Sequence, residues 1–247
     1  RAYQISQMAN VVVYLSSALS VEQILEHDSA HVAIATGARW RSDGYGRQHQ
    51  FPIAGIAGSN LFTPDDIMSG NRPGGNVLVY DDDHYYMGSV MAEQLVADGC
   101  RVTLATPHAV VASWTNYTLE QHRIQARLLE LGVEVIASHA LQEISTLDVT
   151  LACVYSGQPR LVDASSVVMV TSRLPEDAAY QELAADTQRL SDSGIVTLKQ
   201  IGDCHGPATI AAAVYEGHRF ARELGEEVSE IPYRRELTEL ADAFKLP

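Results

Sequence analysis

Three consecutive carboxylates, Asp81-Asp82-Asp83, followed by His84, are the residues whose types and spacing first suggest chemistry. They separate an apolar run at 76–80 from a helix-forming stretch, and a second apolar run follows at 101–106. Strand, turn, helix and strand in this order are typical of a dinucleotide-binding unit. In such units, glycines let the backbone approach a pyrophosphate at the helix N-terminus. Each carboxylate would instead repel a phosphate by about 1–4 kcal/mol, so the sequence predicts the fold and discourages its usual ligand.

The acidic run and His84 could also hold a hard cation, because such ions favour clustered oxygen ligands. Three neighbouring residues rarely point their carboxylates at one centre, however, and the sequence favours a solvated turn. His27, Asp28 and His31 pose the same question. Their spacing could hold a metal on a helix, but Ser29 and the strand that follows indicate a loop. We therefore predict no metal site.

A thiol and an imidazole are neighbours in Asp203-Cys204-His205. Such a pair activates a nucleophile only when the two side chains are within hydrogen-bond reach of each other. Adjacent side chains seldom face each other, so we predict no nucleophile here and no catalytic residue elsewhere in the chain.

Two other segments could contact a nucleotide. Ala35-Thr36-Gly37 ends one apolar strand, and Gly202-Asp203 follows another. Thr36-Gly37 either contacts an adenylate or only makes a tight turn. Asp203 either accepts a hydrogen bond from a ribose or ribitol hydroxyl, or caps a helix that starts at Pro207.

The elements that position these residues follow from hydrophobic periodicity and from capping and turn signals. Strands are predicted at 11–15, 31–37, 76–80, 101–106, 133–137, 149–155, 160–162, 166–171 and 195–201. Helices are predicted at 20–26, from 63, after Gly88, at 118–131 and at 207–224, and residues 149–162 resemble a hairpin. Capping boxes at Ser20 and Thr118 mark two of the helix starts.

Composition narrows the class of partner. The chain has 247 residues, 46% of them hydrophobic, and a formal net charge of −14, which argues against nucleic acid and anionic membranes. Its three cysteines form no CxxC pair, so we expect no iron–sulfur or zinc site and reduced thiols in the cytoplasm. No apolar run approaches the roughly 20 residues that span a bilayer. The chain starts at Arg1 without a methionine, and we interpret it as a fragment.

A strand that ends in Ala-Thr-Gly, an inserted strand–helix unit and a late strand that ends in Gly-Asp together resemble the two-dinucleotide-domain flavoproteins. The closer resemblance is to the C-terminal half of trimethylamine dehydrogenase and its relatives, the dimethylamine, histamine and dimethylglycine dehydrogenases and dienoyl-CoA reductase. The residues that carry it are Ile34–Asp43 with Gly44, Tyr80–Met87, Tyr117–Leu131, Ile201–Glu223 and Ile231–Glu236.

The resemblance implies an α/β fold with two Rossmann-like three-layer domains, one inserted into the other. With a linker at 71–75, the predicted parts are a first ADP/FAD-type domain at 1–75 without its N-terminal portion, a degenerate NAD(P)-type domain at 76–171, and a return to the first domain at 172–247. The cofactor-binding residues expected from the family are Ala35, Thr36, Gly37, Gly202 and Asp203. Flavin mononucleotide and a 4Fe-4S cluster belong to a preceding barrel, which also holds the catalytic centre.

The family also implies two groups for the inserted domain, which binds NADPH in the reductases and has lost that role in the amine dehydrogenases. The acidic turn places this chain in the second group. Two details agree: Thr106-Pro107 lacks the acidic residue that would grip a ribose, and Ser172 stands where the family has glycine.

The predicted function is therefore the nucleotide-binding and structural part of an amine-dehydrogenase-like oxidoreductase. By resemblance, the parent is a homo-oligomer that passes electrons from a small amine to an electron-transfer flavoprotein. Trp114 and Tyr117 could form a docking surface for that carrier, a hydrophobic staple or an interdomain seam. Two alternatives are a reductase domain that binds FAD and NAD(P)H, and a stand-alone partner-binding module.

Overall fold

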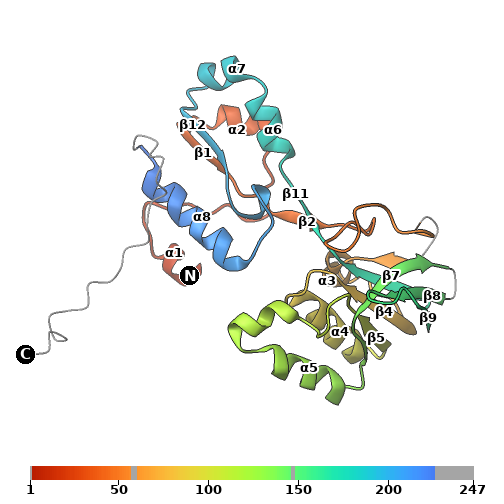
Figure 1. Cartoon of the computed structure of the whole chain (residues 1–247). Helices are drawn as coiled ribbons and strands as arrows, with labels where there is room; N and C mark the ends of the chain where they lie inside the picture. The colour runs from red at the N-terminus through yellow and green to blue at the C-terminus, as the bar shows by residue number, and fades with distance from the viewer. Residues whose placement is uncertain (1, 57–59, 146–147, 226–247) are drawn as a thin grey trace, which may run out of the picture. The chain divides into compact units, whose positions relative to one another are not determined.

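The computed structural model describes residues 2–56, 60–145 and 148–225, which form two compact units (Figure 1). Of the described residues, unit 1 combines 2–37 with 175–225, and unit 2 lies within the continuous segment Ala38–Leu174. One segment of the predicted resemblance, Ile231–Glu236, lies outside the described residues.

Unit 2 is built on a five-stranded parallel sheet in the order β3-β10-β4-β5-β6. Its strands are β3 (Leu61–Phe62), β4 (Asn76–Asp81), β5 (Arg101–Ala105), β6 (Glu134–Ile136) and β10 (Ser166–Val170). Every residue of β10 is buried, as expected for a parallel strand covered on both faces. The strands predicted at 76–80, 101–106, 133–137 and 166–171 are confirmed.

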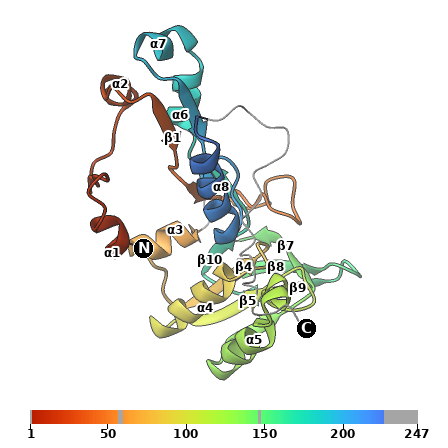
Figure 2. The ribbon, with the colours of Figure 1, turned by 90° about the vertical axis from the view of Figure 1, so that its left-hand side faces the viewer.

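Different layers cover the two faces of this sheet (Figures 1 and 2). The helical layer contains α3 (Pro64–Ser69), α4 (Met87–Ala97), η1 (Ser113–Thr118) and α5 (Gln121–Glu130), and the opposite layer is an antiparallel sheet of β7 (His139–Ile144), β8 (Asp148–Cys153) and β9 (Pro159–Asp163). Val77 and Val79 pack with the helices, whereas Leu78 and Tyr80 pack with β7–β9. This alternation follows from the two-residue repeat of a strand, and the predicted hairpin and three-layer fold are confirmed.

The observed helix starts show which of the predicted capping boxes form. Ser20 and Thr63 both form complete capping boxes. The box predicted at Thr118 is wrong, because Thr118 ends η1 and donates its hydroxyl to the Thr115 carbonyl at 3.1 Å. Leu119 then adopts a left-handed φ of 62°, and α5 begins after Glu120 without a side-chain cap.

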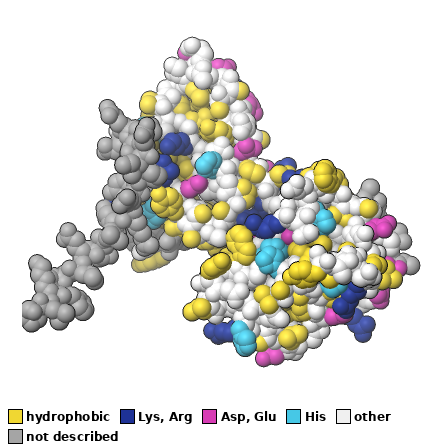
Figure 3. All heavy atoms as spheres, viewed as in Figure 1, with side chains coloured by type: hydrophobic (Ala, Val, Ile, Leu, Met, Phe, Trp, Pro, Cys, Tyr) yellow, Lys and Arg dark blue, Asp and Glu magenta, His cyan; other side chains and the backbone are white. Residues whose placement is uncertain are grey.

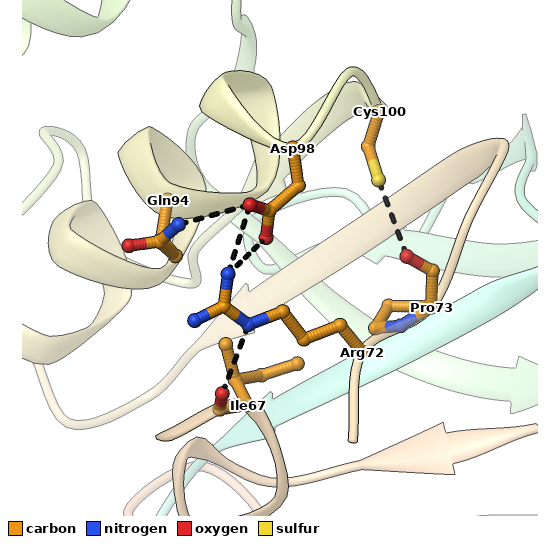
Figure 4. Close-up of polar contacts among 6 residues, drawn as sticks. All are labelled: Ile67, Arg72, Pro73, Gln94, Asp98 and Cys100. Carbon is orange, nitrogen blue, oxygen red and sulfur yellow. Dashed lines mark hydrogen bonds and ion pairs between the residues drawn. The ribbon is translucent and has the colours of Figure 1, made fainter. Parts of the chain in front are cut away.

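The segment predicted as a linker, residues 71–75, is anchored within unit 2 (Figure 4). Arg72 donates to the Ile67 carbonyl at 3.1 Å and to both carboxylate oxygens of Asp98 at 2.8 Å, and Cys100 donates to the Pro73 carbonyl at 3.3 Å. Upstream of it, β3 pairs with β10 in the main sheet. The predicted boundary at residue 75 is therefore corrected to residue 37.

Unit 1 has a two-stranded parallel sheet of β1 (His31–Ile34) and β12 (Thr197–Gln200). Its helices are α1 (Ala2–Ser6), α2 (Val21–Glu26), α6 (Ala178–Ala184), α7 (Thr187–Asp192), η2 (Gly202–Cys204) and α8 (Ile210–Glu223). The core is small and centres on Val21, Ile34, Leu183 and Cys204. Strands β2 (Ala38–Trp40) and β11 (Arg173–Pro175) pair where the chain enters and leaves unit 2.

Two predictions in unit 1 are wrong. Residues 11–15 form no strand, and their side chains are exposed, Leu15 by 84%, because β-branched residues favour a strand only where a half-buried pleated surface receives them. The last helix begins at Ile210 with Thr209 as its N-cap rather than at Pro207.

Figure 3 shows hydrophobic side chains on the surface of both units. Within the described ranges, no helix is both long and apolar enough to span a membrane.

Candidate functional site

Unit 1 brings together the two segments predicted to contact a nucleotide. In the parallel pair β1–β12, Ile34 is the register partner of Gln200, and the Ile201 amide donates to the Ile34 carbonyl at 2.9 Å. Ala35-Thr36-Gly37 and Gly202-Asp203 therefore follow the same edge of one sheet. We call these two segments the strand-end site.

Both glycines of the strand-end site have left-handed backbones, with φ of 82° at Gly37 and 66° at Gly202. A Cβ on Gly37 would meet nothing within 4 Å, and one on Gly202 would lie 3.6 Å from the Ala213 Cβ. Backbone conformation rather than crowding therefore requires glycine at both positions. Each leaves main chain uncovered by a side chain, as close approach of a ligand requires.

The main chain of Glu176 joins the two halves of the site. The Thr36 hydroxyl and the Cys204 thiol both donate to the Glu176 carbonyl, the latter at 3.5 Å. The Glu176 amide donates to the Gly37 carbonyl at 2.9 Å. Thr36 thus serves the fold at this point, and its hydroxyl would have to change partner to contact a ligand.

Protein groups also contact Gly202 and Asp203. An oxygen of the Asp203 carboxylate accepts from the Ala208 amide at 3.2 Å, just before α8. The Gly202 amide donates to Glu216 Oε2 at 2.6 Å, and the other Glu216 oxygen lies 2.9 Å from His205 Nδ1. Asp203 therefore holds the backbone that leads into α8. Glu216 accepts the hydrogen bond that the Gly202 amide could otherwise donate to a phosphate.

A cavity of about 340 Å³ adjoins this loop, between β12, α6 and α8. Its lining is Tyr180, Lys199, Gln200, Ile201, His205, Glu216, Arg219, Phe220 and Glu223. Both cations pair with one carboxylate: Arg219 Nε lies 2.7 Å and Lys199 Nζ 3.9 Å from Glu223 oxygens. Since α8 has no fully buried residue, this face of unit 1 is lightly packed.

In unit 2, the acidic turn is buried, and the predicted solvated turn is wrong. Asp81 and Asp82 are 0% exposed and His84 is 2% exposed. One Asp81 oxygen accepts from the amides of Asp83 and His84 at 3.2 and 3.0 Å. Asp82 accepts from the Gln48 amide at 2.8 Å. These backbone donors replace water and make burial of the carboxylates feasible.

Burial dominates the electrostatics of this turn. It raises the pKa of Asp81 to about 7, although the backbone amide and the imidazole of His84 act in the opposite direction. Burial also raises the pKa of Asp83, against the opposing effect of Arg173 and Arg47. His84 Nε2 lies 3.3 Å from an Asp82 oxygen, and His84 has a left-handed φ of 65°.

The cysteine and histidine side chains that the sequence suggested for chemistry each contact a different residue. Cys204 turns to Glu176 and His205 to Glu216, so thiol and imidazole have different partners. His27 contacts Ser29, and His31 contacts Thr197, each through Nδ1. In the described part of the chain, no three side chains of His, Cys, Asp or Glu are grouped as metal ligands.

Several residues at these sites escape sequence reasoning. Gln48 and Gly46 lie in a stretch that the sequence predicts only as loop, yet Gln48 binds Asp82 from 34 positions away. Glu216 and Glu176 lie in stretches with no motif that marks them out. The local sequence does not identify them, because their roles depend on long-range contacts.

Known proteins resemble this chain in sequence and in fold. A family model described as OYE-like second alpha/beta domain matches residues 62–166. Histamine dehydrogenase from Rhizobium sp. 4-9 is 44% identical with a TM-score of 0.90, over 97% of this chain and 38% of that chain. Dimethylamine dehydrogenase of Hyphomicrobium sp. (strain x) is 32% identical over 241 residues, 88% of this chain and 33% of the relative. The flavoprotein disulfide reductase of Escherichia coli, 16% identical with a TM-score of 0.55, shares the fold.

The parallel sheets and the inserted unit define an α/β fold, and the similarity to the two dehydrogenases makes this chain a nucleotide-binding-type region of an amine-dehydrogenase-like flavoprotein. More specifically, the chain corresponds to the C-terminal portion of a trimethylamine, dimethylamine or histamine dehydrogenase-like protein. It spans about a third of the length of these relatives.

Proposed function

We propose that unit 1 binds ADP, or the ADP half of FAD, at the strand-end site. The observation that carries this proposal is the juxtaposition of Thr36-Gly37 and Gly202-Asp203 after two paired parallel strands. In doubly wound folds, ligands bind beyond the carboxyl ends of the strands. A longer protein of the family would supply the remaining contacts.

Each residue of the site has a role in this proposal. Ala35, Gly37 and Gly202 leave room for the nucleotide beside the main chain, and Thr36 faces the adenylate. Asp203, whose carboxylate also accepts from the Ala208 amide, accepts a hydrogen bond from a ribose or ribitol hydroxyl. The N-terminus of α8, where Thr209 makes no side-chain cap, contributes a positive dipole end.

The activity of the whole protein follows by analogy with its relatives. We place flavin mononucleotide and a 4Fe-4S cluster in the part of the parent that this chain does not include. There the parent would oxidise a small amine, as a homo-oligomer in the cytoplasm, a location in keeping with the free thiols of Cys100, Cys153 and Cys204. Unit 2, with its buried acidic turn, would not bind NADH or NADPH.

Asp203→Ala in the longer protein tests the nucleotide site. We expect ADP or FAD to bind about tenfold more weakly, because a hydrogen bond to a charged acceptor is lost, while flavin mononucleotide is retained. Asp192→Ala is the matched control, since Asp192 is an exposed residue of α7 with the same charge. Unchanged ADP or FAD retention would reduce Asp203 to a structural cap, and equal loss of both cofactors would indicate misfolding.

For the electron acceptor, we propose that an electron-transfer flavoprotein contacts η1. Tyr117 and Leu119 are 90% and 88% exposed, and Trp114, with the Arg47 guanidinium 4.3 Å from its ring centre, is 40% exposed. Such exposure does not fit a hydrophobic staple. Tyr117→Ala should slow reduction of the carrier by the longer protein and leave oxidation of the amine unchanged. An unchanged carrier rate would refute the assignment.

A further inference from the structure

A segment of unit 2, residues 45–49, covers the carboxyl ends of β4 and β10. The Gln48 amide donates to the Asp82 carboxylate at 2.8 Å, immediately after β4. The Ser172 hydroxyl, just after β10, donates to the Tyr45 carbonyl at 2.6 Å. We call residues 45–49 the covering segment.

Close packing shows that the covering segment touches both strand ends. A Cβ on Gly46 would overlap Asp82 Oδ2 and would lie 3.2 Å from the Cβ of Thr171. The Gly46 amide also donates to the His49 carbonyl at 3.0 Å, which closes the segment into a tight loop. Only glycine allows the backbone to pass this close to Asp82.

The Asp81 carboxylate fills a second part of the same region. It accepts from the amides of Asp83 and His84, which precede α4. A Cβ on Gly88, in the first turn of α4, would lie 2.5 Å from Asp81 Cγ. Successive amides before a helix are the groups that hold a phosphate in nucleotide-binding units. In unit 2, a carboxylate of the protein itself takes that position.

The region retains polar groups that the protein does not fully satisfy. Asp81 Oδ2, Asp82 Oδ1 and Thr171 Oγ1 are buried and have no hydrogen-bond partner among the described residues. Asp82 Oδ1 lies 3.3 Å from His84 Nε2. Unsatisfied buried groups of this kind are costly. They indicate a polar crevice that the chain has closed rather than an ordinary apolar core.

We propose that unit 2 carries a built-in plug against nucleotides. The covering segment, held by Asp82, closes the crevice between β4 and β10, and Asp81 occupies its phosphate position. The exclusion of dinucleotides then depends on intramolecular contacts and can be relieved by breaking them, which distinguishes it from charge repulsion by an exposed acidic turn.

Hydrogen exchange measured by mass spectrometry tests the anchor. Asp82→Ala removes the acceptor of the Gln48 amide, and Gly46→Ala displaces the segment from the opposite side. Both should speed exchange in residues 45–49 by about tenfold or more, while β5 and β8 remain protected. Glu130→Ala, with the same charge change at an exposed residue of α5, should match the wild type. Fast exchange of 45–49 in the wild type, or equal acceleration in all variants, would overturn the proposal.

Titration with ADP-ribose tests the blocking itself, in an Asp203→Ala background that weakens the proposed site of unit 1. In this background, the Asp81→Gly/Asp82→Ala variant should bind ADP-ribose at least about tenfold more tightly than the chain with an intact acidic turn. Glu93→Ala/Glu130→Ala, in the same background, removes the same formal charge from solvent-accessible side chains of α4 and α5 and should show no gain. An equal gain in both variants would show that net charge alone excludes the nucleotide, and no gain in a folded Asp81→Gly/Asp82→Ala variant would show that the plug is not the obstacle. Either result would reject the proposal.

Discussion

At the scale of single residues, buried carboxyl groups couple the stability of unit 2 to pH. The pKa of Asp81 is raised from 3.8 to about 7, chiefly by burial. The folded state therefore binds a proton between these values that the unfolded state has released. Stability is then highest at low pH and falls as the pH rises towards about 7. His84 and the carboxylate of Asp83 are the charged neighbours that act on Asp81.

Asp81→Asn should remove this dependence. The wild type should lose stability by up to about 1 kcal/mol per pH unit from about pH 4 to about pH 7, whereas the amide has no proton to release. Urea unfolding followed by tryptophan fluorescence reports unit 2, because both Trp40 and Trp114 belong to it. Glu130→Gln is the exposed control. Parallel pH profiles for wild type and Asp81→Asn would contradict the prediction.

Gly88→Ala sets two effects against each other. In an exposed helix interior, this change gains about 1 kcal/mol, but here the new Cβ would lie 2.5 Å from the buried Asp81 Cγ. Overpacking costs about 1–3 kcal/mol, so we expect a net loss in the free energy of unfolding. Gly74→Ala is the matched control, since its Cβ would meet nothing within 4 Å. A gain at Gly88 would show that Asp81 can move aside.

At the scale of elements, the segment 71–75 links α3 to the end of α4 through Arg72 and Asp98. A free linker would make such a contact dispensable. Because the pair is about one third exposed or less, its contribution is discounted for solvent screening. The hydrogen bonds to the Ile67 carbonyl and from Gln94 to Asp98 add geometric order to the pair.

Arg72→Ala should lower the free energy of unfolding of unit 2 by about 1 kcal/mol. A double-mutant cycle with Asp98→Ala should give a coupling of about 0.5 kcal/mol. Arg127→Ala serves as comparison, because its ion pairs are longer, 3.8 Å, and its side chain is 54% exposed. A coupling energy of zero between Arg72 and Asp98 would show that residues 71–75 act only as a linker.

At the scale of the whole molecule, the two units differ in how the chain builds them. Unit 2 is one continuous segment with two apolar cores, one on each face of its sheet. Unit 1 is assembled from both ends of the chain around a small core and two strands. Continuous segments with their own cores fold independently more readily than discontinuous ones.

The fragment Ala38–Leu174 should therefore fold on its own. Its ends lie together because β2 pairs with β11. We expect a cooperative urea transition with a midpoint close to that of the full chain when both are followed by tryptophan fluorescence. A fragment that unfolds without cooperativity would show that unit 2 needs unit 1.

Local sequence patterns were sufficient for most of the elements. Apolar runs predict β4, β5 and β10, and the spacing of Ile124, Leu128 and Leu131 predicts α5 up to Gly132. Residues 11–15 have the same β-branched character but no sheet to receive them. A strand-like pattern therefore shows that a segment could be buried in a sheet. Whether it forms a strand depends on a neighbouring strand to pair with.

The sequence by itself determined the class of fold, because strand and helix periodicities are local properties of neighbouring residues. It also identified Thr36-Gly37 and Gly202-Asp203 as segments that follow strands, and parallel pairing placed them at one edge. Only the tertiary structure decided the state of the acidic turn. Whether Asp82 is solvated depends on the Gln48 amide and on Gly46, more than thirty positions away. A charged side chain can be buried only where other groups donate hydrogen bonds to it. The local sequence does not show which distant backbone group will be that donor.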